Sequence, residues 1–126
     1  MESFKKGLGR HYLVEFYECS AEILDDDVIL KEAMLKAAEI SGATIIDSVF
    51  HRFAPQGFSG VVVIAESHFS IHTWPENNYA AVDLFTCSPK MMVERALDFL
   101  AESIECQHTE VKEVERGIDA IDSSED

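Results

Sequence analysis

The chain has 126 residues, of which 47% are hydrophobic and 10% aromatic, and its formal charge is −14 at pH 7. This length and apolar content predict one domain over residues 1–126 that needs neither a disulfide nor a metal ion to fold. The strong negative charge argues against nucleic acid or an anionic membrane as a partner. No apolar run reaches the roughly 20 residues of a membrane span, and residues 1–10 lack a signal-peptide core. Three cysteines without framework spacing favour reduced thiols, so we expect a cytoplasmic protein.

The amino-terminal third predicts one strand and one helix. Residues 11–18 (HYLVEFYE) are rich in aromatic and branched side chains, which is typical of a strand. Residues 25–27 are three aspartates, which we place at the positive end of a helix. Gly42 is expected to end that helix as a left-handed cap residue. The apolar stripe of the helix comprises Leu30, Ala33, Met34, Ala37 and Ala38.

Three apolar segments in the middle of the chain are each expected to form a strand. They are residues 43–53, 60–66 and 69–74. Turn signals at residues 55–57 and 75–78 follow the first and the third of them. Residues 79–87 are expected to form another strand.

The last third predicts a second helix, a last strand and a tail. Ser88, with Pro89 in the first helical position, is expected to open the helix. Residues 106–114 are expected to form the strand, and the acidic residues 118–126 a flexible tail. The apolar stripe of the helix comprises Val93, Ala96, Leu97, Leu100 and Ile104.

The element order β-α-β-β-β-β-α-β predicts the fold class. Four consecutive strands joined by short turns must be mostly antiparallel, because parallel neighbours need crossovers. Two helices can cover only one face of the sheet, so we expect an α+β two-layer sandwich with both helices on that face. Residues 60–65 are nevertheless apolar on both faces, whereas a one-sided sheet alternates. We therefore expect a partner subunit on the second face.

The middle of the chain, residues 65–76 (AESHFSIHTWPE), closely resembles the small prokaryotic S-adenosylmethionine decarboxylases. The resemblance covers about residues 7–88, in order and at consistent spacing. A Glu-Ser-His triplet alone would carry almost no information, but this block followed by Leu-Phe-Thr-Cys is highly specific. The other matching segments are residues 9–11 (GRH), 15–19 (EFYEC), 41–44 (SGAT), 51–53 (HRF), 60–64 (GVVVI) and 83–87 (DLFTC).

The resemblance implies that the chain cuts itself between Glu66 and Ser67. Ser67 Oγ would attack the Glu66 carbonyl to give an ester, and loss of the Ser67 α-proton would expel Glu66. The remaining dehydroalanine would hydrolyse to a covalently bound pyruvoyl group and ammonia, leaving a β chain, residues 1–66, and an α chain, residues 67–126. The pyruvoyl ketone would form a Schiff base with S-adenosylmethionine and take up the electrons of decarboxylation. The product would be the aminopropyl donor of spermidine biosynthesis.

Three more residues match catalytic positions of the family. His72 would abstract the α-proton, for which an imidazole pKa of about 6.5 is suited; otherwise it is a hydrogen-bonded strand histidine. Cys87 would reprotonate the substrate α-carbon, since a thiol with a pKa of about 8.5 keeps its proton at pH 7; otherwise it is a small buried residue. Ser59 would assist processing by hydrogen bonding to the reacting backbone, or would only form a turn before a glycine.

Two residues match substrate-binding positions of the family. Glu76 would accept hydrogen bonds from the ribose hydroxyls, unless it is merely a solvated turn acid. Phe53 would stack on the adenine, and its ring would also attract the sulfonium, unless it belongs to the core. We expect no metal site, because His68 and His72 on one strand would sit about 13 Å apart.

Strand geometry adds an expectation about the quaternary structure. Ser67 and His72 on one strand would lie about 16 Å apart and on opposite faces, too far for proton transfer. We therefore expect a homodimer with shared active sites, in which each Ser67 meets Ser59 and His72 of the other subunit. Cys87 could come from the same chain as Ser67.

Three other interpretations stay open from the sequence. The same scaffold could carry a pyruvoyl decarboxylase of arginine or another basic amino acid, because the electron sink is indifferent to the substrate side chain. The chain could also be an unprocessed homologue that regulates an active copy, although the intact set of reactive residues argues against this. It could finally be a small ligand-binding domain that shares only the scaffold.

Overall fold

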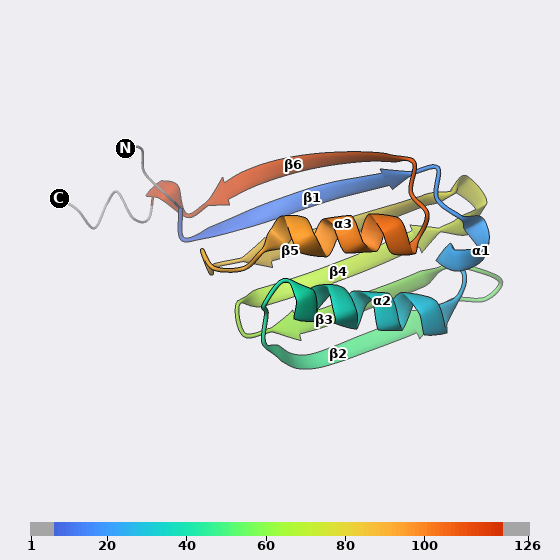
Figure 1. Ribbon diagram of the computed structural model, residues 1–126, viewed down its shortest axis with the longest axis horizontal. Coiled ribbons are helices and arrows are strands. Elements are labelled where there is room, and N and C mark those ends of the chain that lie inside the picture. Colours follow the sequence, from blue (N-terminus) through green and yellow to red (C-terminus); the bar gives the residue numbers. More distant parts are fainter. Residues whose placement is uncertain (1–6, 120–126) are drawn as a thin grey trace.

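Residues 7–119 are described by the computed structural model, and they form a six-stranded sheet covered by helices on one face (Figure 1). The strands lie in the order β2-β3-β4-β5-β1-β6, and all neighbours are antiparallel. This confirms the predicted α+β two-layer sandwich. The strands are β1 (Gly9–Tyr17), β2 (Ile45–Arg52), β3 (Phe58–Ile64), β4 (Ser67–Trp74), β5 (Tyr79–Thr86) and β6 (His108–Arg116).

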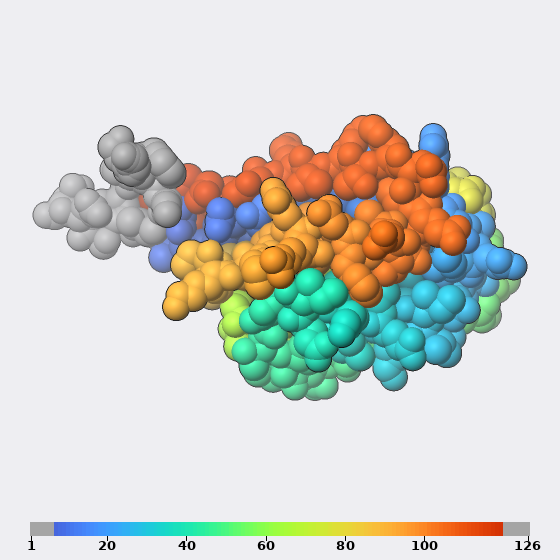
Figure 2. Space-filling view, viewed as in Figure 1, coloured from blue at the N-terminus to red at the C-terminus, as the bar shows by residue number. Residues whose placement is uncertain are grey.

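Two long helices, α2 (Asp27–Ile40) and α3 (Val93–Ser103), pack side by side on the same face of the sheet (Figure 2). The Asp26 side chain caps α2 by accepting a hydrogen bond from the Ile29 N–H at 3.0 Å. Gly42 has a φ of 87° just beyond the end of α2, as predicted. Both predicted apolar stripes are buried against the sheet, so the helical periodicity identified the correct faces.

Two short helical turns were not predicted. They are α1 (Ala21–Leu24) and the 3₁₀ turn η1 (Pro75–Asn77), and they contact each other at one end of the sheet. The Ser20 hydroxyl opens α1 by accepting a hydrogen bond from the Ile23 N–H at 3.2 Å. A single turn has no apolar periodicity of its own, which is why sequence patterning does not reveal it.

The predicted start of the second helix is wrong, because α3 begins at Val93 and not at Ser88. The Ser88 N–H donates to Thr86 Oγ1 at 3.0 Å, and Ser88 Oγ accepts from the Lys90 N–H at 3.2 Å. These local bonds close a turn, which competes with the helix for the same backbone groups. The predicted strands at residues 11–18 and 106–114 also differ by one or two residues at each end from β1 and β6.

The second face of the sheet is left open by the described residues (Figure 1). Along β4, Phe69, Ile71 and Thr73 are buried beneath the helices, and the alternate side chains point to this open face. Val49 is 68% exposed there. The other exposed apolar side chains of the open face are Leu13, Tyr17, Val63 and Trp74.

Apart from residues 118 and 119, the expected tail 118–126 lies outside the described residues. Within residues 7–119, the helices are too short or too polar to cross a membrane.

Removal of a core side chain should destabilise this fold strongly. Leu100 is fully buried between α3 and the sheet, so Leu100→Ala should lower the free energy of unfolding by about 2–5 kcal/mol. Val28 is 61% exposed on α2, and Val28→Ala should change it by less than about 0.5 kcal/mol. Urea unfolding of both variants in a Ser67→Ala background, which keeps the chain in one piece, checks this. Equal effects of the two substitutions would contradict the described core.

Candidate active site

Ser67 lies at the start of β4, directly after the tight turn from β3. It pairs with Ile64 across the hairpin and with Thr86 on the other side. Its φ of 156° is a value that residues with a side chain rarely adopt. The backbone conformation is therefore unusual at the predicted cleavage position.

The carbonyl that precedes Ser67 is held by Cys87. The Cys87 backbone N–H donates to the Glu66 carbonyl oxygen at 3.1 Å, and the Cys87 thiol lies 3.2 Å from the same oxygen. The Glu66 carboxylate accepts a hydrogen bond from the Thr44 N–H at 3.1 Å, which fixes the turn from a third side. Two donors on one carbonyl oxygen form the arrangement that stabilises a developing oxyanion. Cys87 is exposed, so the alternative of a small buried residue does not apply.

Ser59 and His72 face each other across β3 and β4. Ser59 Oγ lies 2.8 Å from His72 Nδ1, and the two residues are partners in the strand register. This contact fixes the orientation of the imidazole and leaves Nε2 on the opposite edge of the ring. Both side chains are half-buried on the open face. Ser59 is therefore a strand residue and not the turn residue that one interpretation of the sequence allowed.

The structure does not bring Ser67 and His72 together within one chain. Both belong to the uninterrupted strand β4, five residues apart, which corresponds to about 16 Å. The chain therefore presents two separate groups of candidate residues. Glu66, Ser67 and Cys87 form the cleavage group, and Ser59 and His72 form the assisting group.

Phe53 and Glu76 lie at the same end of the sheet as the assisting group. The Phe53 ring is 45% exposed and packs edge-on against the His51 ring, with centroids 4.5 Å apart. His51 is the register partner of Ser59, so Phe53 borders the assisting group and is not a core residue. Glu76 is exposed on η1 and lines a hollow of about 610 Å³ together with Asp25 and Gln56.

The other two cysteines, Cys19 and Cys106, lie away from the two candidate groups. Cys19 is buried, and burial together with the neighbouring Cys106 raises the pKa of its thiol to about 12. Cys106 is half-exposed, and its thiol lies 3.1 Å from the His108 carbonyl oxygen. Within residues 7–119 there is no group of three or more His, Cys, Asp or Glu side chains that could hold a metal ion.

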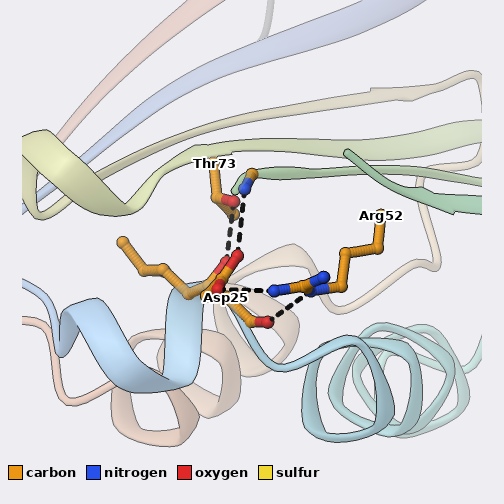
Figure 3. A network of polar contacts seen from close by, with 5 residues as sticks. Asp25, Arg52 and Thr73 are labelled. Atoms are coloured by element: carbon orange, nitrogen blue, oxygen red, sulfur yellow. Dashed lines mark hydrogen bonds and ion pairs between the residues drawn. The ribbon is translucent and has the colours of Figure 1, made fainter. Parts of the chain in front are cut away.

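The sequence does not reveal a polar network that includes Asp25, Arg52 and Thr73 (Figure 3). The sequence places Asp25 at the start of a helix, whereas its carboxylate pairs with Arg52 at 2.7 Å. The Gly57 N–H and the Arg52 guanidinium lower the pKa of Asp25 below its usual value. The two side chains are 27 residues apart in the chain, and no spacing rule relates them.

Family models and curated relatives with sequences similar to this chain carry the same family name. The family model described as S-adenosylmethionine decarboxylase matches residues 10–117. The S-adenosylmethionine decarboxylase proenzyme of Thermotoga petrophila is 52% identical over 112 residues, which are 89% of this chain and 86% of the relative. The proenzyme of the same name from Moorella thermoacetica is 50% identical over 113 residues, 90% of each chain.

Solved structures agree with this assignment. The crystal structure of the adenosylmethionine decarboxylase from Aquifex aeolicus matches with a TM-score of 0.82 and 37% identity, covering 90% of this chain and 93% of that chain. The Trypanosoma brucei AdoMetDC monomer matches with a TM-score of 0.57 and 13% identity over 81% of this chain and 44% of that chain, which shows the fold alone. The family model and the bacterial relatives both cover most of the sequence, and the chain belongs to the S-adenosylmethionine decarboxylase family.

Proposed function

We propose that the chain is a self-processing decarboxylase of S-adenosylmethionine that cuts itself between Glu66 and Ser67. The observation that carries the proposal is the pair of Cys87 donors on the Glu66 carbonyl oxygen. A backbone carbonyl in an ordinary hairpin turn does not need a thiol as a second donor. The family membership supports the substrate, and the proenzyme names of the relatives support processing.

The first step of processing is an acyl shift from nitrogen to oxygen. Ser67 Oγ attacks the Glu66 carbonyl carbon, and the negative charge develops on the oxygen that faces the two Cys87 donors. The bond from this carbon to the Ser67 nitrogen then breaks, so that an ester replaces the peptide bond and the nitrogen becomes a free amine. The unusual φ of Ser67 raises the energy of the uncut chain and favours this step.

The second step is an elimination for which a base is needed. His72 removes the Ser67 α-proton as general base, with its ring held by Ser59. The electron pair forms a double bond from Cα to Cβ, and Glu66 leaves as a carboxylate. The resulting amino-terminal dehydroalanine tautomerises and reacts with water, which releases ammonia and leaves a pyruvoyl group.

The residues around Ser67 would fit a pyruvoyl group at this position, because the Cys87 N–H and thiol lie beside the scissile bond. When present, the group takes up the electron pair of the bond between the substrate α-carbon and its carboxylate when that bond breaks. The Cys87 thiol, which lies 3.2 Å from the Glu66 carbonyl oxygen, would donate a proton to the substrate α-carbon. Phe53 offers a ring face to the adenine, and Glu76 offers carboxylate oxygens to the ribose hydroxyls. The decarboxylated product would be the aminopropyl donor for spermidine, in a cytoplasm that keeps the thiols reduced.

We further propose that the active site is shared by two copies of the chain. The cleavage group and the assisting group lie toward opposite ends of β4, and neither is complete alone. In such a dimer the open faces of two sheets pack together, and the twofold axis lies between them, perpendicular to the strands. This axis reverses the strand direction in the partner. The Ser67 end of one sheet then faces the His72 end of the other.

The open face supports this dimer. It carries exposed apolar side chains, Val49 among them, which a second sheet would remove from water. Ser67 Oγ lies 3.5 Å from His68 Nδ1, and the His68 ring contacts Phe85 on the same face. The reacting hydroxyl therefore lies beside His68, a side chain of the open face.

Loss of the Ser67 hydroxyl should abolish processing and activity together. Denaturing mass spectrometry should find the wild-type chain as two pieces, residues 1–66 and 67–126, and Ser67→Ala as one chain of 14.1 kDa. Ser48→Ala, a strand serine of the β2 edge, should be processed normally. Release of labelled carbon dioxide from S-adenosylmethionine and not from arginine should accompany processing. An intact wild-type chain, or release from arginine alone, would contradict the proposed function.

Mixing two inactive variants should restore processing if the site is shared. In a dimer of one Ser67→Ala chain and one His72→Ala chain, one site joins the intact Ser67 of the second chain to the intact His72 of the first. Coexpression should therefore yield cut His72→Ala chains and uncut Ser67→Ala chains, which mass spectrometry distinguishes.

The matched control replaces the first chain by the double variant Ser67→Ala, His72→Ala, with which no cutting should occur. A site built within one chain would leave every chain uncut in both mixtures. That result would exclude the shared site and leave the decarboxylase proposal standing.

A further inference from the structure

The loop of residues 53–57 joins β2 to β3 and begins with Phe53. The Phe53 N–H donates to the Gly57 carbonyl oxygen at 2.8 Å, which closes the loop at its base. Gly57 has a φ of 108°, which a residue with a side chain could adopt only with strain. The position of the Phe53 ring therefore depends on how this base is attached to the rest of the molecule.

Asp25 binds both ends of the loop. Its Oδ2 accepts a hydrogen bond from Arg52 Nη2 at 2.7 Å, and its Oδ1 accepts one from the Gly57 N–H at 3.0 Å. Arg52 Nε also donates to the Asp25 carbonyl oxygen at 3.0 Å. Arg52 directly precedes Phe53, so one aspartate fixes the backbone on both sides of the loop (Figure 3).

Asp25 is itself attached to the sheet. It lies at the junction of α1 and α2, and Thr73 Oγ1 donates to the carbonyl oxygen of the preceding residue, Leu24, at 2.8 Å. Thr73 is buried on β4, one residue from His72. The contacts thus run from β4 through the helix junction to the loop (Figure 3).

Asp25 also borders the hollow that contains Glu76. The hollow of about 610 Å³ is lined by Gln56 from the loop, by Glu76 from η1 and by Asp25 from the junction of α1 and α2. Hydrogen bonds from the Gly57 N–H and Arg52 keep the pKa of Asp25 below its usual value, so the carboxylate stays charged at neutral pH. A charged acceptor makes stronger hydrogen bonds than a neutral one.

We propose that Asp25 and Arg52 are positioning residues that fix the Phe53 ring relative to Glu76, so that both can hold the nucleoside end of the substrate. This inference rests on the proposed function, in which Phe53 and Glu76 bind that end. Neither Asp25 nor Arg52 needs to touch the substrate. Their loss should therefore weaken substrate binding and leave self-cleavage and turnover at saturation unchanged.

The main test is the kinetics of Asp25→Asn in the full-length, self-cleaved enzyme. Asparagine keeps an acceptor for the Gly57 N–H but loses the ion pair with Arg52. We expect KM for S-adenosylmethionine to rise roughly tenfold with kcat within about twofold of the wild type. Arg52→Lys keeps the charge but loses one of the two donors to Asp25, so it should raise KM as well.

Asp26→Asn is the matched control. It removes the same charge one residue away and borders the same hollow, while asparagine still caps α2. We expect its KM to equal that of the wild type. An equal rise of KM in both aspartate variants would mean that the negative charge of the hollow attracts the cationic substrate, and would overturn the positioning role.

A double-mutant cycle with Phe53→Ala separates positioning from general stability. If Asp25 acts through Phe53, Asp25→Asn should raise KM by less than about twofold once the ring is absent. Additive effects in the cycle, or an unchanged KM in Asp25→Asn and Arg52→Lys, would overturn the inference. The wild-type enzyme in the same assay tests the proposed function separately, because an inactive wild type would refute that function whatever the variants do.

Discussion

The fixed length of β4 determines how the proposed active site can be assembled. The strand pairs with β3 on one side and with β5 on the other from Ser67 to Trp74, so it cannot bend its two ends together. Ser67 and His72 are therefore held apart by backbone hydrogen bonds that any rearrangement would have to break. A rigid sheet that separates reacting groups within one chain can still align them between two chains, because a twofold axis reverses the direction of the strand. A dimer of this kind would explain both the apolar open face and the separation of Ser67 from His72.

The residues proposed for processing and those proposed for substrate binding are held by different kinds of structure. The Glu66 carbonyl and its Cys87 donors lie at the ends of paired strands, where backbone hydrogen bonds fix their positions. Phe53 lies on a loop that is closed by one backbone hydrogen bond to Gly57 and tied to the rest of the molecule by side-chain contacts from Asp25. Under the proposed function, substitutions in the network around Asp25 would change substrate binding without a change in the sheet.

The sequence predicted the parts of the fold that depend on periodic burial. The stripe from Leu30 to Ala38 identified the buried face of α2 because a helix repeats its pattern over several turns. The prediction of the second helix start was wrong because local hydrogen bonds compete with the helix there. Ser88 bonds to the Lys90 N–H, and α3 begins only at Val93. For the site, the residues remain a prediction from the resemblance, and strand geometry correctly separated Ser67 from His72 along β4. Contacts between distant segments, such as Asp25 with Arg52, follow only from the folded backbone.

The order of strands in the sheet has a consequence for the durability of the cut protein. Residues 1–66 contribute β1, β2 and β3, whereas the later residues contribute β4, β5 and β6, and β1 lies between β5 and β6. The two pieces would therefore be interleaved in a single sheet, with α2 from one packed beside α3 from the other. They could separate only by unfolding, and refolding would require two molecules to meet. The lifetime of the mature protein would then depend on its rate of unfolding and not on an equilibrium that allows repair.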